Sequence, residues 1–356
     1  MLIPRFPLRR VGLVLIALVA AFGPLVATAS SDAQTTPSAL CGGFGYVVTN
    51  SGSLIAFDTQ TGLLLGSPVA TGSSPADVDV TADGSRVVVP ATYSDELQIF
   101  DAATLALIGS VPMVTPGRVA VSSVSDIAYV TQGAQNQISI VDLSTLTVTG
   151  TIATAGDASF VALSADGSTI WVAEYSTSTI ERFTSAGNPV GSAIVLSAHP
   201  ESIALTPDGT TAYVTTLFDN TIVEIDAQTA MVFDHAIQNF PQSAIVTPDG
   251  QHLWFSGMGG GQVEQYALPA FTPEQTASAP GNPMGIALTA DGATIFVVTA
   301  IGGTLTGIST ADASQFSVAA VTGTPRGVAV CPQVAPAPVP TTTTIAVDPI
   351  APSFTG

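Results

Sequence analysis

The stretch Val80-Thr-Ala-Asp-Gly-Ser-Arg-Val-Val-Val-Pro90 decides the fold of this chain, because close copies of it recur along the sequence. Four copies keep the central Asp-Gly, and a fifth has Val124-Ser125 in its place. Successive copies are 41 or 42 residues apart, beginning at Val80, Val121, Leu163, Leu205, Val246 and Leu288. A fixed period of this length indicates a repeat architecture.

Each period predicts the same four strands. An apolar strand precedes the Asp-Gly pair, which is a strong hairpin signal because the turn needs positive φ. A second apolar strand follows, then a polar loop, a third strand of alternating polarity and a weaker fourth strand. The third strand often ends in an aspartate that we expect to hydrogen-bond its own turn: Asp58, Asp101, Asp142 and Asp226. Four antiparallel strands in about 40 residues are typical of a β-propeller blade.

The register of the repeat predicts how the ring closes. Counting back one period from Val80 places residues 46–49 in a second strand whose first strand is missing. Counting forward from Leu288 makes Pro325–Val330 a first strand without its other three strands. The two fragments complete one blade. We therefore predict an all-β fold, a seven-bladed β-propeller of four-stranded antiparallel blades, in which N- and C-terminal strands share one blade.

Several repeats resemble a known family. Tyr46-Val-Val-Thr-Asn50, Tyr129-Val-Thr-Gln132 and Tyr213-Val-Thr-Thr216 are similar to the signature of YVTN-type β-propeller repeats. The resemblance covers residues 42–333 and implies an extracytoplasmic propeller of the surface-layer or lactonase-like seven-bladed kind. The departures are the lost Asp-Gly near Ser125 and the missing aspartate after three third strands, near Phe183, Tyr266 and Ile308. The motif specifies the fold better than the function.

The two ends of the chain are predicted to lie outside the propeller. Arg5, Arg9 and Arg10 precede a 17-residue apolar run and the small residues around Ala29, which predicts a secretory signal peptide over residues 1–29. A retained membrane anchor is the alternative, but a spanning helix needs about 20 apolar residues. Residues 30–41 form a short lead-in. Residues 334–356 are rich in Pro and Thr and are expected to be a disordered tail.

Charge and composition exclude several classes of partner. The 356 residues include no lysine, and only four arginines follow the predicted signal peptide, against 26 acidic residues in the chain, a net charge of −22 after cleavage. Such a surface repels nucleic acid and anionic lipid. We therefore predict a secreted or cell-surface protein with no nucleic-acid partner and no membrane insertion after signal cleavage, and we expect a monomer.

The two cysteines occupy consecutive positions of one repeat turn, although they come from opposite ends of the chain. We predict a Cys41–Cys331 disulfide that replaces the covalent turn of the other blades. Because the loop it closes spans 290 residues, the chain-entropy model allows about 5 kcal/mol. Two free thiols or a metal pair are the alternatives.

A search for catalytic motifs finds none. No Gly-x-Ser-x-Gly and no His-Glu-x-x-His occurs, and the chain has only three histidines. We therefore predict no catalytic residue, no metal site and no cofactor. Loops at one face of a propeller surround the mouth of its central channel, and several charged residues fall in those loops. The candidate ligand-binding residues are His199, Glu201, Arg326, Asp157, Arg118, Asp77 and Glu174. The plainer alternative is that they are solvated loop residues.

Three hypotheses for function follow. The first is a secreted or cell-surface scaffold that binds a protein, glycan or small ligand through its loop face. The second is a lactonase- or lyase-like enzyme at the channel mouth, using His199 with Glu201 or Glu174. The third is a structural component of a surface array. The arginines at the mouth, Arg118 and Arg326, favour an anionic ligand.

Overall fold

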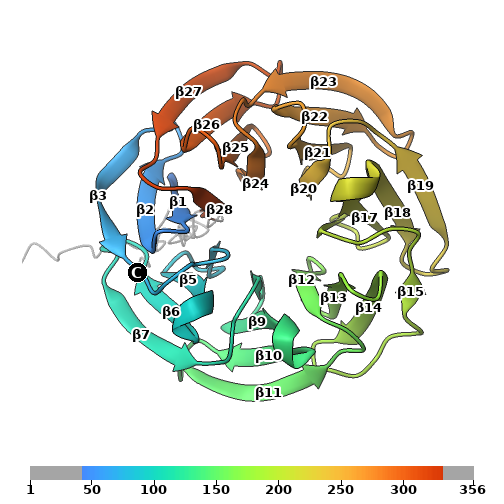
Figure 1. Cartoon of the computed structure of the whole chain (residues 1–356), viewed down its shortest axis with the longest axis horizontal. Coiled ribbons are helices and arrows are strands. Elements are labelled where there is room, and N and C mark those ends of the chain that lie inside the picture. The colour runs from blue at the N-terminus through green and yellow to red at the C-terminus, as the bar shows by residue number, and fades with distance from the viewer. Residues whose placement is uncertain (1–41, 332–356) are drawn as a thin grey trace, which may run out of the picture. The chain divides into compact units, whose positions relative to one another are not determined.

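The computed structural model describes residues 42–331, which form a ring of seven four-stranded antiparallel sheets around a central channel (Figure 1). This confirms the predicted seven-bladed β-propeller. The predicted signal peptide, the lead-in over residues 30–41 and the tail over residues 334–356 lie outside the described residues. Within residues 42–331, no helix is long and apolar enough to cross a membrane.

The blades are numbered here in ring order, and each is given from its innermost strand outward. Blade 1 consists of β28 (Pro325–Val330), β1 (Phe44–Thr49), β2 (Ser53–Asp58) and β3 (Leu64–Ala70). Blade 2 consists of β4 (Asp79–Val80), β5 (Arg86–Ala91), β6 (Glu96–Asp101) and β7 (Leu107–Pro112). Blade 3 consists of β8 (Val119–Val121), β9 (Ile127–Gln132), β10 (Gln137–Asp142) and β11 (Thr147–Ala153). Blade 4 consists of β12 (Ala158–Leu163), β13 (Thr169–Glu174), β14 (Thr179–Thr184) and β15 (Ile194–Val195).

The remaining blades follow the same plan. Blade 5 consists of β16 (Ser202–Leu205), β17 (Thr211–Thr216), β18 (Thr221–Asp226) and β19 (Val232–Ala236). Blade 6 consists of β20 (Pro241–Val246), β21 (His252–Gly257), β22 (Gln262–Ala267) and β23 (Thr272–Ser278). Blade 7 consists of β24 (Pro283–Leu288), β25 (Thr294–Thr299), β26 (Thr304–Ser309) and β27 (Gln315–Ala320). Three single-turn helices follow second strands: η1 (Thr92–Ser94), η2 (Gly133–Gln135) and η3 (Leu217–Asp219).

The Asp-Gly turns are stabilised because the aspartate side chain accepts hydrogen bonds from other groups of the same turn. In blade 2, Asp83 accepts hydrogen bonds from the Thr81 hydroxyl (2.6 Å) and from the backbone N–H of Ser85 (2.9 Å), and Gly84 takes φ +69°. The aspartates that end the third strands act in a similar way, as predicted. Asp101, for example, accepts bonds from the backbone N–H and the hydroxyl of Thr104.

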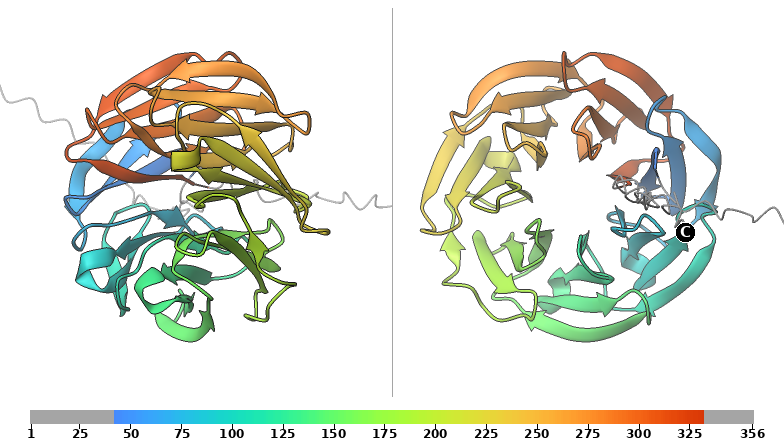
Figure 2. Two further views of the ribbon diagram at one scale, coloured as in Figure 1. Left: turned by 45° about the vertical axis from the view of Figure 1, so that its right-hand side comes forward. Right: turned by 180° about the vertical axis from the view of Figure 1, so that it is seen from behind.

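Blade 1 joins the two ends of the described chain. β28 pairs antiparallel with β1, from Gly45 opposite Val330 to Thr49 opposite Pro325. The red β28 lies beside the blue β1 in both views of Figure 2. The backbone N–H of Cys331 donates to the carbonyl of Phe44 (3.0 Å), which extends the pairing past the strand. Cys41 lies outside the described residues, so the proposed disulfide stays a prediction.

The core lies between neighbouring blades, where second and third strands bury both of their faces. Trp171 and Trp254, which the repeat places at matching positions of β13 and β21, are 3% and 0% exposed. Tyr46 is fully buried and donates its hydroxyl to the carbonyl of Ala102 in the next blade (2.7 Å). The packing leaves the loops before the innermost strands, here called the leading loops, to shape the channel mouth.

Candidate functional site

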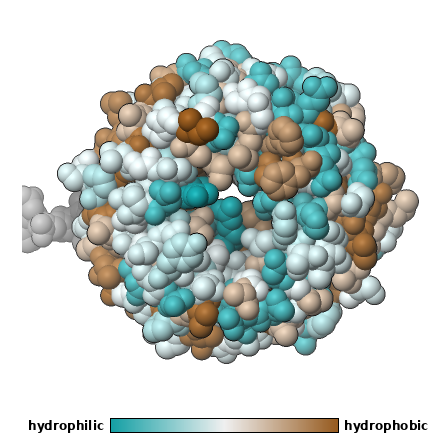
Figure 3. Space-filling view, viewed as in Figure 1, coloured by the Kyte–Doolittle hydropathy of each residue, from teal (hydrophilic) through white to brown (hydrophobic). Residues whose placement is uncertain are grey.

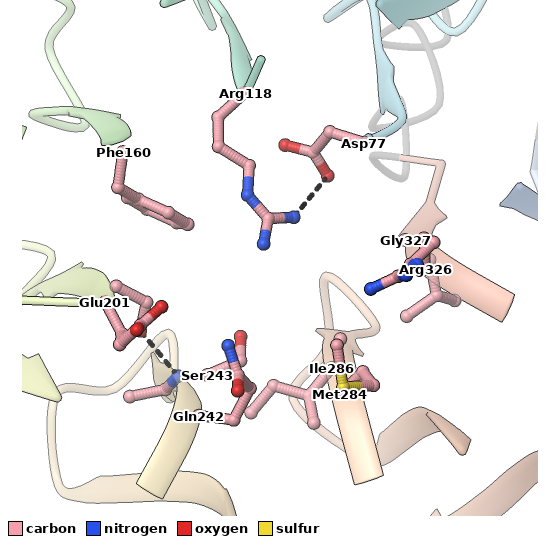
Figure 4. Close-up of a pocket in the computed structure, with 14 residues that line it drawn as sticks. Asp77, Arg118, Phe160, Glu201, Gln242, Ser243, Met284, Ile286, Arg326 and Gly327 are labelled. Carbon is pink, nitrogen blue, oxygen red and sulfur yellow. Dashed lines mark hydrogen bonds and ion pairs between the residues drawn. The ribbon is translucent and has the colours of Figure 1, made fainter. Parts of the chain in front are cut away.

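The innermost strands surround a cavity of about 140 Å³ at the end of the channel where these strands begin (Figure 4). Four of the seven predicted residues line it: Asp77, Arg118, Glu201 and Arg326. Most of the other side chains in its wall come from the same two positions of the repeat: Phe160, Ser202, Gln242, Ser243 and Met284. Ala244, Ile286 and Val328 come from the next position along the strand.

Arg118 is held in place by its neighbours. Its Nη1 donates to the carbonyl of Ala76 (3.1 Å) and lies 3.8 Å from the Asp77 carboxylate. The guanidinium also lies 5.9 Å from the centre of the Phe160 ring, within the range of a cation–π contact. Asp77 is fixed in turn, because it accepts a bond from the backbone N–H of Val119 (3.3 Å). Arg118 therefore reaches the cavity with a fixed orientation, as Figure 4 shows.

The carboxylates of the channel have raised pKa values. Burial raises the pKa of Asp77, although the Arg118 charge opposes the rise. Burial likewise raises the pKa of Glu201, opposed by Arg118, a hydrogen bond from Gln242 and His199. Two residues along the chain from Asp77, Asp79 has a pKa raised to about 7 by burial, although it accepts bonds from the backbone N–H groups of Val80 and Val121. Each of these three carboxyl groups therefore takes up a proton at a higher pH than a carboxyl group in water does.

Arg326 contributes a second guanidinium from the other side of the cavity. Its side chain is exposed, and among the described residues it has no hydrogen-bond or ion-pair partner. Bare backbone at Gly285 and Gly327 forms the wall beside it. A methyl group on Gly327 would lie 3.1 Å from the Cα of Asp77, so a larger residue there would crowd the cavity.

The other three predicted residues do not line the cavity. Asp157 accepts a bond from the backbone N–H of Ser176 (2.7 Å) and so ties two loops together. His199 stacks on Tyr175, with ring centres 4.7 Å apart, and its Nδ1 lies 2.7 Å from the Tyr175 carbonyl and 2.9 Å from the Ser178 hydroxyl. Because Nδ1 faces a carbonyl, it carries the proton in that contact. These side chains stabilise the loops of the mouth.

Glu174 forms a buried acid pair with Glu181. It is fully buried, and its Oε2 accepts bonds from the hydroxyls of Thr177 (2.8 Å) and Thr179 (2.7 Å). Burial opposes its ionisation, but hydrogen bonds from Glu181 and the two threonines outweigh burial and lower its pKa. Burial and the nearby Glu174 raise the pKa of Glu181 to about 7. Glu181 is therefore the member of the pair that takes up a proton more readily.

The uncharged part of the wall was not among the predicted residues. Phe160 occupies the repeat position of Asp77 and Arg118, and Gln242 and Met284 occupy that of Glu201 and Arg326. The repeat register could have found them, but a search for charged groups could not. Among residues 42–331, no three His, Cys, Asp or Glu side chains gather in a way that could hold a metal ion.

Comparison with known proteins shows the fold and no family. No family profile matches the chain, and no curated protein matches it. Among solved structures, a functionally unknown protein from Desulfotomaculum acetoxidans DSM 771 has a TM-score of 0.71 and 20% identity, over 82% of this chain and 99% of that one. Hydrazine synthase from Kuenenia stuttgartiensis has a TM-score of 0.66 and 18% identity, over 73% and 90%.

A third structure is a "putative 6-phosphogluconolactonase" from Bacteroides uniformis ATCC 8492, with a TM-score of 0.67 and 15% identity, over 80% of this chain and 98% of that one. At these identities the likeness extends to the fold, and functions differ widely among proteins that share a fold. The chemistry of this chain has to be inferred from its own residues.

Proposed function

We propose that this chain is an exported, YVTN-type propeller that binds a small anionic group, a carboxylate or a phosphate, in the cavity at its channel mouth. The observation that carries the proposal is the position of Arg118 and Arg326. They are two of only four arginines in residues 42–331, in a chain that has no lysine and a net charge of −19. Both line the same cavity.

The surroundings of the two arginines suit an anion. Asp77 lies 3.8 Å from Arg118, and among the described residues no carboxylate forms an ion pair with Arg326. A guanidinium can offer a carboxylate or phosphate two parallel hydrogen bonds. The cavity has a volume of about 140 Å³, which is enough for one such group.

The test is an NMR-detected titration with sodium acetate and inorganic phosphate at low ionic strength. We expect Arg326→Gln and Arg118→Gln each to weaken anion binding about tenfold or more, since a hydrogen bond to a charged group contributes about 1.5–3 kcal/mol. Arg86→Gln is the matched control, because Arg86 donates to the Leu143 carbonyl away from the cavity. Equal affinity in all four proteins would refute the site.

A second candidate function is hydrolysis of a lactone, favoured by Glu201. Its raised pKa is suited to a general base, and it shares the cavity with two guanidinium groups. Glu201 would take a proton from water, which attacks the lactone carbonyl. An arginine would stabilise the oxyanion, and the ring C–O bond would then break as Glu201 returns the proton to the leaving ring oxygen. Glu201→Gln should abolish hydrolysis of gluconolactone while acetate still binds; unchanged hydrolysis would exclude this role.

The proposal also includes a cleaved signal peptide and a Cys41–Cys331 disulfide that closes the ring. Cys331 is 3% exposed and follows β28 directly, and Cys41 comes three positions before β1 in the sequence. We expect a linked peptide that contains Cys41 and Cys331 in a non-reduced digest of the secreted protein. Free thiols at both positions would contradict the disulfide, and an uncleaved N-terminus would contradict the signal peptide.

A further inference from the structure

Exposed apolar side chains surround the charged cavity. Tyr93, Phe218 and Ile301 occupy matching positions after second strands, and Val114 and Phe240 lie in leading loops. They are 78%, 67%, 63%, 50% and 41% exposed, in the same order. We call these five residues the apolar rim. Figure 3 shows brown patches beside the teal central opening, one of them over the inner ends of β17 and β20. Several large apolar side chains left exposed around one opening favour an interaction site there.

Phe240 is the most informative member of the rim, because its backbone is strained. It takes φ +53° directly after Asn239 at φ +75°, and a bulky residue is a true outlier in this region. The loops around it hold it there. The side-chain oxygen of Asn220 accepts a bond from its N–H (2.8 Å), and its carbonyl accepts one from the N–H of Met258 (3.1 Å). Bulky residues take positive φ in other turns of this propeller as well, so the exposed aromatic side chain, and not the strain, is the feature to explain.

The matching positions of other leading loops show what the scaffold alone requires. Ser74, Thr115 and Asn282 take φ values of +52°, +42° and +59° with small or polar side chains. The turn therefore forms without a phenylalanine at this position. Exposure of the Phe240 ring to water does not stabilise the fold. Its ring is available to a partner.

The rim is continuous with one wall of the cavity. Phe240 comes two residues before Gln242, which lines the cavity, and the neighbouring β24 adds Met284 and Ile286 to the wall. Arg326 follows on β28. Figure 4 shows Met284 and Ile286 between Gln242 and Arg326. If the anionic group of a ligand binds Arg326, the rest of the ligand would therefore lie against these apolar side chains.

We propose that the channel mouth binds the carboxyl terminus of a partner polypeptide whose last residues are apolar. The terminal carboxylate would meet Arg326 and Arg118, and the apolar side chains would pack on Met284, Phe240 and Phe218. This inference rests on the proposed anion site. A polypeptide is favoured over a glycan because aliphatic Val114 and Ile301 belong to the rim. Such side chains bury apolar atoms well and offer nothing to sugar hydroxyls.

Charge also favours a ligand with a single carboxylate. Asp95, Asp157 and Asp219 lie in the loops of the mouth, so a ligand with many negative groups would be repelled outside the cavity. Asp95 and Asp157 are fixed there by bonds from the backbone N–H groups of Thr115 and Ser176. Only the arginine pair would accept an anion.

The test compares acetate, N-acetyl-Leu-Phe with a free carboxylate, its C-terminal amide, and glucuronate by NMR titration. We expect the acyl dipeptide acid to bind about tenfold or more tightly than acetate, because burying one large apolar side chain is worth about 1.5–3 kcal/mol of affinity, which is about tenfold or more. The amide should bind about tenfold or more weakly than the acid.

Phe240→Ser separates the rim from the cavity. It should lower the affinity for the dipeptide acid to that for acetate, while acetate affinity stays as in the wild type. Phe233→Ser is the matched control, since Phe233 is 49% exposed on the outer strand β19. A melting curve shows that the variant is folded; if it is not, Phe218→Ser gives the same comparison.

Each outcome decides between the two proposals. If acetate binds and the dipeptide acid binds no better, the peptide inference fails and the anion site stands. If neither acetate nor the dipeptide binds, the proposed function itself fails. If glucuronate binds more tightly than the dipeptide acid, the mouth recognises a sugar acid and the peptide inference is overturned.

Discussion

The carboxyl groups in turns and a smaller set of buried carboxyl groups differ in their pKa values. Ten aspartates in turns have pKa values lowered by the hydrogen bonds that they accept: Asp58, Asp83, Asp101, Asp142, Asp166, Asp208, Asp226, Asp249, Asp291 and Asp312. Burial raises the pKa values of four others: Asp77, Asp79, Glu181 and Glu201. The first group recurs with the repeat and builds the scaffold, whereas each of the second occurs once. The comparison separates the turn carboxylates from the buried ones, of which Asp77 and Glu201 line the candidate site.

The largest expected effect of this contrast is loss of stability in acid. A carboxyl group whose pKa is lower in the folded state stabilises the fold above its unfolded pKa, about 4, and loses that contribution as the pH falls. With ten such groups, we expect the urea midpoint to fall steeply between about pH 5 and pH 2. The measurement is urea unfolding at several pH values. A midpoint that stays constant down to about pH 3 would contradict the assignment of these turns.

Removal of a single turn carboxylate should affect stability and leave binding intact. Asp83→Ala removes the acceptor for the Thr81 hydroxyl and the Ser85 N–H. We expect it to lower the free energy of unfolding by about 1–2 kcal/mol, measured with urea, with unchanged acetate affinity. Asp126→Ala is the control, because its carboxylate accepts no hydrogen bond from the described residues, and it should stay within about 0.5 kcal/mol of the wild type.

Asp79 should make the stability of the fold depend on pH in the opposite direction. Its pKa is about 7, so the folded state binds a proton that the unfolded state has lost, and stability falls as the pH rises from about 4 to above 7. The linked loss is at most about 4 kcal/mol, at 1.36 kcal/mol per pKa unit. Carbon-13 NMR of the carboxyl group measures this pKa directly. Titration of Asp79 near pH 4 would place it with the turn aspartates.

Glu181→Gln should produce the smallest change. The glutamine oxygen can still accept the bond that Glu181 accepts from the Ala155 N–H (3.1 Å), as Gln98 does from the Gly72 N–H in blade 2 (2.8 Å). The variant removes the acid pair, so the melting temperature should change less between pH 5 and pH 8. The gain at pH 8 should be under about 1 kcal/mol, because Glu181 is partly solvated. An unchanged pH dependence would show that the pair carries no shared proton.

The repeat alone predicts most of the fold. The spacing of Asp-Gly pairs places the hairpins, and the register of Pro325–Val330 against residues 46–49 predicts the shared blade that β28 and β1 form. These inferences succeed because strand pairing depends on a local turn signal and a constant period. Even the turn of blade 3, which lacks Asp-Gly at Val124-Ser125, keeps its hairpin, because β8 and β9 still pair.

The candidate site is less predictable, because side-chain direction at the mouth depends on the leading loops. Arg326 lies on β28, and Asp77, Arg118 and Glu201 come one or two residues before β4, β8 and β16; all four line the cavity. Asp157 lies one residue before β12 and bonds the neighbouring loop instead. The repeat register carries the signal that a search for charged groups misses: the four residues that line the cavity stand three or four positions before a repeat start, whereas Asp157 stands six before one.

The shared blade also determines how the molecule would respond to a mechanical load. Because β1 begins beside the end of β28, Gly42 and Cys331 lie at the same end of this strand pair. The hydrogen bonds of an antiparallel pair run perpendicular to its strands. A pull on these two points would therefore open the bonds one after another, like a zipper, instead of loading all of them in shear. A covalent link at this edge would take the force before the first bond breaks, and a cell-surface protein held by its ends would gain most from a link there.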